Sequence, residues 1–200
     1  VHADLGTVLR KVYPRIELSK KVDWLQTINS WHKDSQSRDI INVKSERLIG
    51  AQVIREIWKG TNGKALIVSD VGQHQMLEAQ YYQHDEPRTL LTSGGLGTMG
   101  FSLPAAIGAS FHEKDREIWV IVGDGSIQMN IQELQTVKAN NLPIKIFVLN
   151  NNGYGIIKQF QELYLGKRYE ASGKGVSNPD FKKISQAFNI NYNIIKIGRD

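Results

Sequence analysis

The chain has 200 residues, of which 40% are hydrophobic and 22% charged, and its formal net charge is +5. This composition is typical of a globular protein with a real core, no apolar run approaches the roughly 20 residues of a membrane span, and the absence of cysteine excludes disulfides and thiol chemistry. The basic residues are scattered and form no motif with aromatic residues, so we expect neither a nucleic-acid nor a membrane partner. No signal peptide is visible, and we expect a cytoplasmic protein.

In chain order, the sequence predicts helices followed by alternating strands and helices. Short helices are predicted within 3–31, a polar linker at 32–37, and a helix at 45–58 that Ser45 caps. A turn is predicted at Asn62 and Gly63. Strands are predicted at 65–71, 89–92, 118–122, 144–149 and 192–197. Helices are predicted at 74–82, 103–111, 127–141, 154–164 and 179–188. This alternation is typical of an α/β fold with a doubly wound parallel sheet and helices on both faces.

Polar residues directly follow two neighbouring predicted strands. Asp124 follows the strand 118–122, and Asn151 lies in a run of three asparagines after the strand 144–149. Because the amphipathic stretch 127–141 joins them as a crossover helix, the two strands should be parallel neighbours. Asp124 and Asn151 would then share the carboxyl edge of one sheet, where open α/β sheets bind ligands.

The residue types at this edge suit a magnesium–diphosphate site. Magnesium prefers oxygen ligands, which the Asp124 carboxylate, the Asn151 amide and a backbone carbonyl near Gly153 can supply. The glycines on either side of Asp124 let the backbone approach a phosphate closely, and Ser126 and the free amides of the next helix form an anion cradle. The structural alternative is that Asp124 only caps that helix.

A second glycine-rich motif offers a rival interpretation. Residues 95–100 match G-x-G-x-x-G, follow a predicted strand and precede a helix, with Asp124 a little over twenty positions on. This pattern is the fingerprint of a dinucleotide-binding dehydrogenase. Two observations weigh against it. The preceding strand is short and edge-like, and the dehydrogenase interpretation leaves Ser126, the asparagine run and the pair 73–74 unexplained.

Three motifs carry a family resemblance. The Gly-Asp-Gly triplet and the second asparagine of the run, 27 positions after Asp124, resemble the thiamine diphosphate signature. Residues 71–76 (VGQHQM), 92–100 (TSGGLGTMG) and 123–134 (GDGSIQMNIQEL) resemble the large, catalytic subunit of acetolactate synthase. The resemblance runs from about residue 64 to about residue 188.

The resemblance implies a domain organisation and an activity. Residues 1–36 would be the tail of a preceding middle domain with a linker, and 37–200 a C-terminal thiamine diphosphate-binding domain, cut short at its end. The implied enzyme decarboxylates pyruvate and transfers the two-carbon unit to a second 2-keto acid. Its cofactors would be thiamine diphosphate and Mg²⁺, with FAD as an option for the full-length protein.

The resemblance also implies an assembly. Full-length chains would form a homodimer or homotetramer, with a regulatory small subunit as a further option. In this family the glutamate that activates the cofactor comes from the amino-terminal domain of a partner subunit. We therefore expect the 200-residue chain to be a piece of a longer protein, to be inactive alone and to contain no catalytic residue of its own.

The resemblance also implies site residues, each taken from the position of this sequence that matches a family motif. The metal set is Asp124, Asn151 and Gly153. The cofactor-binding set is Val71, Gly72, Gln73, His74, Gly97, Met99, Gly123, Gly125, Ser126, Met129, Tyr154, Gly155 and Ile156. Within it, residues 72–74, Gly125 and Ser126 would contact the diphosphate. Gly97, Met99 and Met129 would line the pyrimidine and the bend of the cofactor, and residues 154–156 would close over it. Ordinary core packing for Met129 and an unliganded helix-start histidine for His74 are the structural alternatives.

The chain departs from the family pattern near its end. Phe160 stands where these synthases usually carry tryptophan in the second-substrate pocket, which leaves an aromatic wall but more room. Residues 168–177 are also atypical. These departures leave open a related carboligase with another acceptor, such as a sugar-linked ketone. A cofactor-binding module without catalytic activity is a further alternative.

Overall fold

The computed structural model describes residues 4–16, 21–37, 40–173 and 175–195. The chain divides into two compact units, Val1–Asn42 and Val43–Asp200. The first unit contains helices α1 (Leu5–Val12) and α2 (Val22–Ser37) and the short 3-10 helices η1 (Tyr13–Arg15) and η2 (Ile40–Asn42). None of the helices in the described ranges is both long and apolar enough to cross a membrane.

Helix α2 corrects the predicted linker at 32–37, because the helix continues through these residues to Ser37. The segment from Val22 to Ser37 contains neither glycine nor proline. Polar residues such as these form a helix at little cost when nothing breaks the hydrogen-bond ladder. A polar composition without glycine or proline is therefore not enough to identify a linker.

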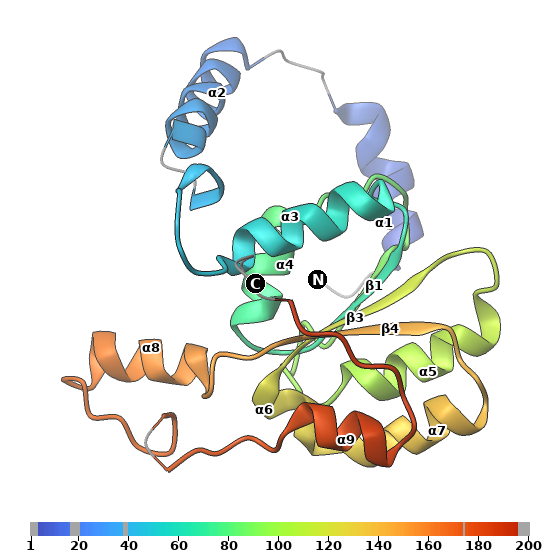
Figure 1. Cartoon of the computed structure of the whole chain (residues 1–200). Coiled ribbons are helices and arrows are strands. Elements are labelled where there is room, and N and C mark those ends of the chain that lie inside the picture. Colours follow the sequence, from blue (N-terminus) through green and yellow to red (C-terminus); the bar gives the residue numbers. More distant parts are fainter. Residues whose placement is uncertain (1–3, 17–20, 38–39, 174, 196–200) are drawn as a thin grey trace. The chain divides into compact units, whose positions relative to one another are not determined.

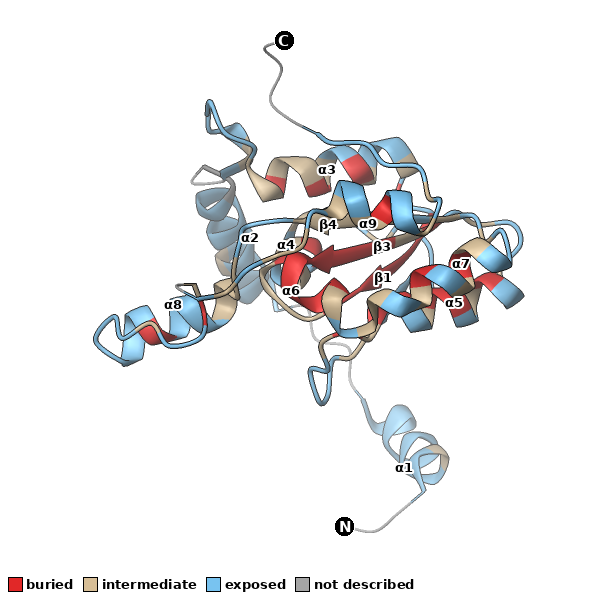
Figure 2. Ribbon diagram, turned by 60° about the horizontal axis from the view of Figure 1, so that its bottom comes forward, coloured by how far each residue is buried: buried red, intermediate tan, exposed pale blue. Residues whose placement is uncertain are grey.

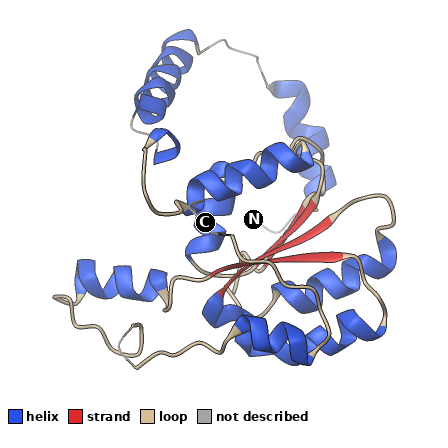
Figure 3. Ribbon diagram, in the orientation of Figure 1, coloured by secondary structure: helices blue, strands red, loops and turns tan. Residues whose placement is uncertain are grey.

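The second unit is built on a four-stranded parallel sheet (Figures 1 and 3). Its strands are β1 (Leu66–Ser69), β2 (Leu90–Thr92), β3 (Ile118–Gly123) and β4 (Ile144–Leu149), in the order β2-β1-β3-β4. All three strand pairs are parallel. This arrangement confirms the predicted α/β fold, and the four strands lie within two residues of the predicted ones.

Helices cover both faces of the sheet (Figure 1). The helices of this unit are α3 (Gly50–Thr61), α4 (Gln73–Tyr81), α5 (Ser102–His112), α6 (Asp124–Ile127), η3 (Gln128–Glu133), α7 (Leu134–Ala139), α8 (Gly155–Tyr164) and α9 (Phe181–Ala187), of which α8 extends away from the sheet. Asn62 ends α3 with a positive φ of 50°, which confirms the predicted turn.

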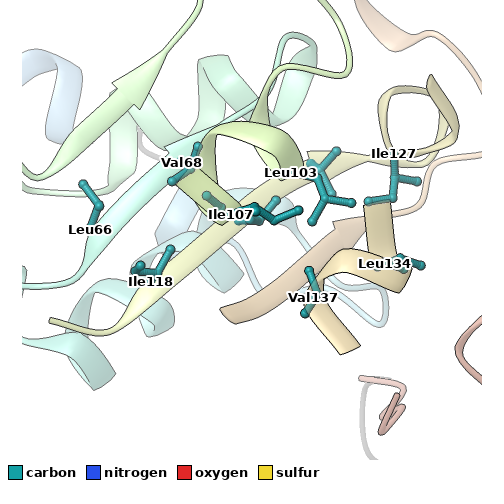
Figure 4. Close-up of a cluster of buried hydrophobic side chains, with 11 residues drawn as sticks. Leu66, Val68, Leu103, Ile107, Ile118, Ile127, Leu134 and Val137 are labelled. Carbon is teal, nitrogen blue, oxygen red and sulfur yellow. The ribbon is translucent and has the colours of Figure 1, made fainter. Parts of the chain in front are cut away.

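Two apolar clusters hold these layers together. Because side chains alternate along a strand, Leu66 and Val68 of β1 face one side of the sheet, where they pack with α5 and α7 (Figure 4). Ile67 and Ile121 face the other side and pack against Ile54 of α3. The central strands are therefore buried on both faces (Figure 2), as near-continuous apolar runs in a parallel sheet require.

The predicted start of one helix and the predicted continuity of another were wrong. Helix α3 begins at Gly50 and not at Ser45, because the Ser45 hydroxyl accepts a hydrogen bond from the Arg47 amide and closes a local turn. The helix predicted at 127–141 is broken at Asn130, which has non-helical φ and ψ of −135° and 34°. Its side-chain amide donates to the Gly100 carbonyl at 2.7 Å, so a contact with a distant loop fixes the kink.

The last predicted strand, 192–197, is also wrong for residues 192–195, which lie in no strand. Residues 196 and 197 lie outside the described residues. The alternation of Tyr192, Ile194 and their neighbours favours a strand only where a ladder partner is available. Here these side chains line a cavity beside β4 instead.

Candidate cofactor site

The predicted metal ligands lie together at the carboxyl edge of the sheet. Gly123 of β3 pairs with Leu149 of β4, so Asp124 and the asparagine run begin side by side, as predicted. Figure 2 shows α6 buried at the end of β3, and Asp124 is only 2% exposed. A buried carboxylate at this edge requires partners.

Hydrogen bonds fix both oxygens of the Asp124 carboxylate. Oδ1 accepts from the Gly125 amide at 3.0 Å. Oδ2 accepts from the Gly153 amide at 3.2 Å and from the Asn178 side-chain nitrogen at 2.5 Å. The helix-cap alternative has little support, because the N-cap of α6 is Gly123 and the helix has four residues.

Asn151 faces α4 on the other side of the site. Its Nδ2 donates to Gln73 Oε1 at 3.0 Å, which leaves its Oδ1 without a hydrogen bond to any described residue. Gly155 lies against the same pair, and a Cβ there would overlap the Gln73 amide. At Gly125 a Cβ would overlap the Tyr154 ring. These two glycines therefore permit a close approach of α4, α6 and α8.

His74 is buried at this edge, with an exposed fraction of 5%. Burial lowers the pKa of its imidazole to about 4, and this effect exceeds the opposite effect of the nearby Asp70 and Asp124 carboxylates. The ring is therefore neutral near pH 7. Its Nε2 has no hydrogen-bond partner among the described residues. A buried polar atom without a partner is costly, and a bound polar ligand would satisfy it.

Asp70 organises the glycine-rich loop, although no sequence motif indicated it. Its side chain is fully buried after β1. Oδ1 accepts from the Val71 and Gly100 amides at 2.8 and 2.9 Å, and Oδ2 accepts from the Ser102 amide and hydroxyl at 2.8 and 2.7 Å. The loop that carries Met99 is thereby tied to the end of β1. The available signal was an aspartate directly after a buried strand, the same pattern that identified Asp124.

A cavity of about 1240 Å³ runs from this edge along β4. It brings together most of the predicted site residues: Val71, Gly72, Gln73, His74, Met99, Gly123, Asp124, Gly125, Ser126, Asn151, Gly153, Tyr154, Gly155 and Ile156. It also continues past apolar residues of β4, α7 and α9.

Three predicted residues lie outside the cavity lining. Gly97 lies on the glycine-rich loop with a φ of 71°. Met129 is half-exposed, which disfavours core packing for it, and it lies beside Gly100. Phe160 lies on α8 with 53% of its surface exposed and contacts Tyr164, with ring centroids 4.9 Å apart. The structure therefore does not bring Phe160 to the other site residues.

The chemistry of the edge fits a magnesium–diphosphate group. In the described part of the chain no cluster of three or more histidine, cysteine, aspartate or glutamate side chains could hold a metal alone. Mg²⁺ usually takes one or two carboxylates and completes its shell with phosphate oxygens and water. Asp124, the Asn151 amide oxygen and the Gly153 carbonyl are suitable oxygen donors.

The dinucleotide interpretation fits the structure less well. The strand before the glycine-rich loop, β2, has three residues and lies at the edge of the sheet. The first strand of a dinucleotide-binding unit is central. The Asp124 carboxylate also accepts hydrogen bonds from the Gly153 amide and the Asn178 side chain. It is therefore not directed toward a ribose that would bind at the glycine-rich loop.

Comparison with known proteins agrees with this geometry. The family model described as "Thiamine pyrophosphate enzyme, C-terminal TPP binding domain" matches residues 70–199. The chain belongs to this family of thiamine pyrophosphate enzymes.

Individual relatives are large subunits of one enzyme. The acetolactate synthase large subunit of Buchnera aphidicola subsp. Acyrthosiphon pisum (strain APS) is 42% identical over 189 residues, which cover 92% of this chain and 33% of that protein. Acetolactate synthase isozyme 3 large subunit of Escherichia coli (strain K12) is 42% identical over 168 residues, covering 83% and 28%. The large subunit of Lactococcus lactis subsp. lactis (strain IL1403) is 38% identical, covering 85% and 29%. The chain thus spans about a third of the length of the relatives it matches.

Proposed function

We propose that the protein contributes the cofactor-binding part of an enzyme that decarboxylates pyruvate and transfers the two-carbon unit to a second 2-keto acid. The observation that carries this proposal is that Asp124 and the asparagine run follow the paired ends of β3 and β4 at one carboxyl edge, beside a cavity lined by the residues of the family motifs. The names of the relatives support the choice of reaction.

The roles of this chain's residues are binding and orientation. Asp124, Asn151 and the Gly153 carbonyl hold Mg²⁺, which neutralises the diphosphate. Backbone amides at the start of α6 and the buried His74 contact the phosphates. Met99, on the loop fixed by Asp70, supports the bend between the cofactor's two rings. When bound, thiamine diphosphate supplies the electron sink for loss of carbon dioxide from a keto acid.

The acceptor and the assembly are further parts of the proposal. By the family resemblance, Phe160 replaces a tryptophan of the second-substrate pocket and leaves more room there, so a bulkier acceptor than a 2-keto acid is the second candidate. The active unit would be a homodimer or homotetramer of full-length chains, with FAD and a regulatory small subunit as options for the whole protein. Symmetric association of this kind is the usual arrangement when a site needs two subunits.

Product analysis tests the proposal. The whole protein is incubated with thiamine diphosphate, Mg²⁺ and pyruvate, beside an Asp124→Ala variant and an Asp115→Asn control at an exposed position. We expect acetolactate and carbon dioxide from the wild type and the control, and neither from Asp124→Ala. Carbon dioxide without acetolactate would support another acceptor. No consumption of pyruvate by the wild type would contradict the proposed donor.

A further inference from the structure

Asn178, which lies three residues before the start of α9, connects three parts of the site. Its Nδ2 donates to Asp124 Oδ2 at 2.5 Å and lies 3.2 and 3.4 Å from the side-chain oxygens of Asn150 and Asn152. Its Oδ1 accepts from Gln128 Nε2 at 3.0 Å. One neutral side chain thus joins the end of β3, the end of β4 and the turn after α6. Neither the motifs nor the family resemblance indicated this residue.

The orientation of the Asn178 amide follows from its neighbours. Gln128 Nε2 also donates to the backbone carbonyl of Asp124 at 2.9 Å, and a carbonyl can only accept. The Gln128 nitrogen therefore faces Asn178, so the Asn178 atom that it meets must be the oxygen. Consequently the NH₂ group of Asn178 faces the Asp124 carboxylate. A charge-assisted hydrogen bond of this kind is stronger than one between neutral groups.

The backbone holds Asn178 in place. Pro179 follows it and disfavours the helical conformation for the preceding residue. Asp180 then caps α9, since its carboxylate accepts from the Lys182 and Lys183 amides at 2.9 and 3.2 Å. The helix itself packs on the core through Phe181 and its neighbours. Asn178 is therefore placed by a capped and docked helix.

The hydrogen bonds divide the site into two sides. Asn178 and the Gly153 amide occupy Asp124 Oδ2, whereas Oδ1 accepts only from the Gly125 amide among the described residues. Asn151 is turned the other way, toward Gln73. An oxygen with one hydrogen bond retains a lone pair for a cation. The Asp124 oxygen left for a metal is thus Oδ1.

We propose that Asn178 is a positioning residue for the divalent cation. By holding Oδ2, it fixes the rotation of the Asp124 carboxylate and presents Oδ1 as the metal ligand. Gln128 acts through Asn178 by fixing the orientation of its amide. This inference rests on the proposed function, because it assumes that Asp124 is a metal ligand. Residues that hydrogen-bond to a metal ligand without contacting the metal typically weaken metal binding by roughly 10- to 100-fold when they are removed.

The test measures metal binding directly and needs no turnover. Mn²⁺ replaces Mg²⁺ as the probe, and the loss of the free Mn²⁺ signal in electron paramagnetic resonance gives its Kd on the whole protein with saturating thiamine diphosphate. We expect Asn178→Leu to weaken Mn²⁺ binding about tenfold. Gln128→Met should weaken it less, in the same direction. The double variant should bind no more weakly than Asn178→Leu, because the two residues act in one chain of hydrogen bonds.

A matched control is Asn140→Ala, because Asn140 is exposed and its side chain donates to the Thr136 carbonyl at the end of α7. It should leave the Kd unchanged. An unchanged or tighter Kd in Asn178→Leu overturns the inference, since the tighter value would mean that the amide competes with the cation. If Asn178→Leu does not fold, an unchanged Kd in Gln128→Met overturns it. A wild type that binds no Mn²⁺ overturns the proposed metal site as well.

Discussion

Glu78 is a buried carboxylate that the proposed function does not use. It is 1% exposed on α4, and its Oε1 lies 2.7 Å from His84 Nε2. His84 Nδ1 lies 2.9 Å from Thr89 Oγ1, whose hydroxyl donates to the Glu86 carbonyl. Because that hydroxyl proton is committed, His84 Nδ1 must be the donor to Thr89. A single proton is then shared between Glu78 and His84 Nε2.

From the Glu78–His84 pair we expect the free energy of unfolding to depend on pH. Burial raises the pKa of the Glu78 carboxyl above its ordinary value of 4.5, and this effect exceeds the lowering by His84. The folded state therefore binds the proton more tightly than the unfolded chain does. The stabilisation is complete below pH 4.5 and is lost as the pH rises through the raised pKa. In Glu78→Gln, the amide can donate to His84 Nε2 without carrying a charge.

We expect Glu78→Gln to gain stability relative to the wild type as the pH rises from about 4.5 to 8. Urea unfolding at a series of pH values measures this difference. The exposed Glu46→Gln variant serves as the control and should show no such trend. A difference between Glu78→Gln and the wild type that stays constant with pH would contradict the prediction.

Gly155 gives a second prediction for a single residue. A Cβ at this position would overlap the Gln73 amide and press on Asn151 Nδ2, 2.9 Å away. Overpacking of this kind costs roughly 1–3 kcal/mol, and it would also separate Gln73 from Asn151. We expect Gly155→Ala to lower the free energy of unfolding by about that amount. It should also weaken thiamine diphosphate binding in titration calorimetry.

Gly108 provides the matched control. It is an exposed residue within α5, and a Cβ there meets no atom within 4 Å. Gly108→Ala should therefore stabilise the protein by about 0.5–1 kcal/mol and leave cofactor binding unchanged. Equal effects of the two substitutions on cofactor binding would show that the close contact at Gly155 is unimportant.

At the scale of elements, the sequence predicted those that depend on local patterns. Strands β1, β3 and β4 were found because apolar runs mark the strands of a covered parallel sheet, whereas β2 is a short and largely exposed edge strand. The position of Asp124 beside the asparagine run followed from the connectivity of β3 and β4. The break at Asn130 was not predictable in this way, because its cause is a bond to Gly100, 30 residues away.

Asp70 and Asn178 were not predicted from the sequence for the same reason as the break at Asn130. Asp70 contacts Gly100 across 30 residues, and Asn178 contacts Asp124 across 54. Asparagine and aspartate after a strand or before a helix are also common as caps and turn residues. Their sequence positions alone therefore do not distinguish a local role from a distant one. The fold supplies that distinction, because it determines which loops meet.

Asp70 allows a prediction about how elements are joined. Its carboxylate accepts from the amides of Val71, Gly100 and Ser102 and from the Ser102 hydroxyl. Asp70→Asn keeps the shape but replaces one acceptor with an NH₂ donor. The Ser102 hydroxyl can rotate to accept from it, whereas the Ser102 amide loses its partner. A buried donor left unpaired costs about 1–3 kcal/mol.

We therefore expect Asp70→Asn to lower the free energy of unfolding by about that amount. Amide hydrogen exchange should accelerate at Gly100 and Ser102, because the loop is then less firmly attached to β1. Asp115→Asn, at an exposed bend, should change neither quantity. Unchanged exchange at Gly100 would mean that the loop is held by other contacts.

At the scale of the whole molecule, the site contains little that could perform chemistry. Among the described residues that line the cavity, Asp124 is the only carboxylate, and its oxygens are accounted for by hydrogen bonds and the proposed metal.

These observations predict that the 200-residue chain binds its cofactor without turning over substrate. The groups proposed for the metal and the diphosphate line the cavity, but none of the described residues in that lining is a glutamate that could activate the pyrimidine. We expect titration calorimetry to detect Mg²⁺-dependent binding of thiamine diphosphate to the chain. A carbon dioxide assay with pyruvate should detect release only with the whole protein. Release of carbon dioxide by the chain alone would require an activating group within these residues. The expectation that another domain supplies this group would then be wrong.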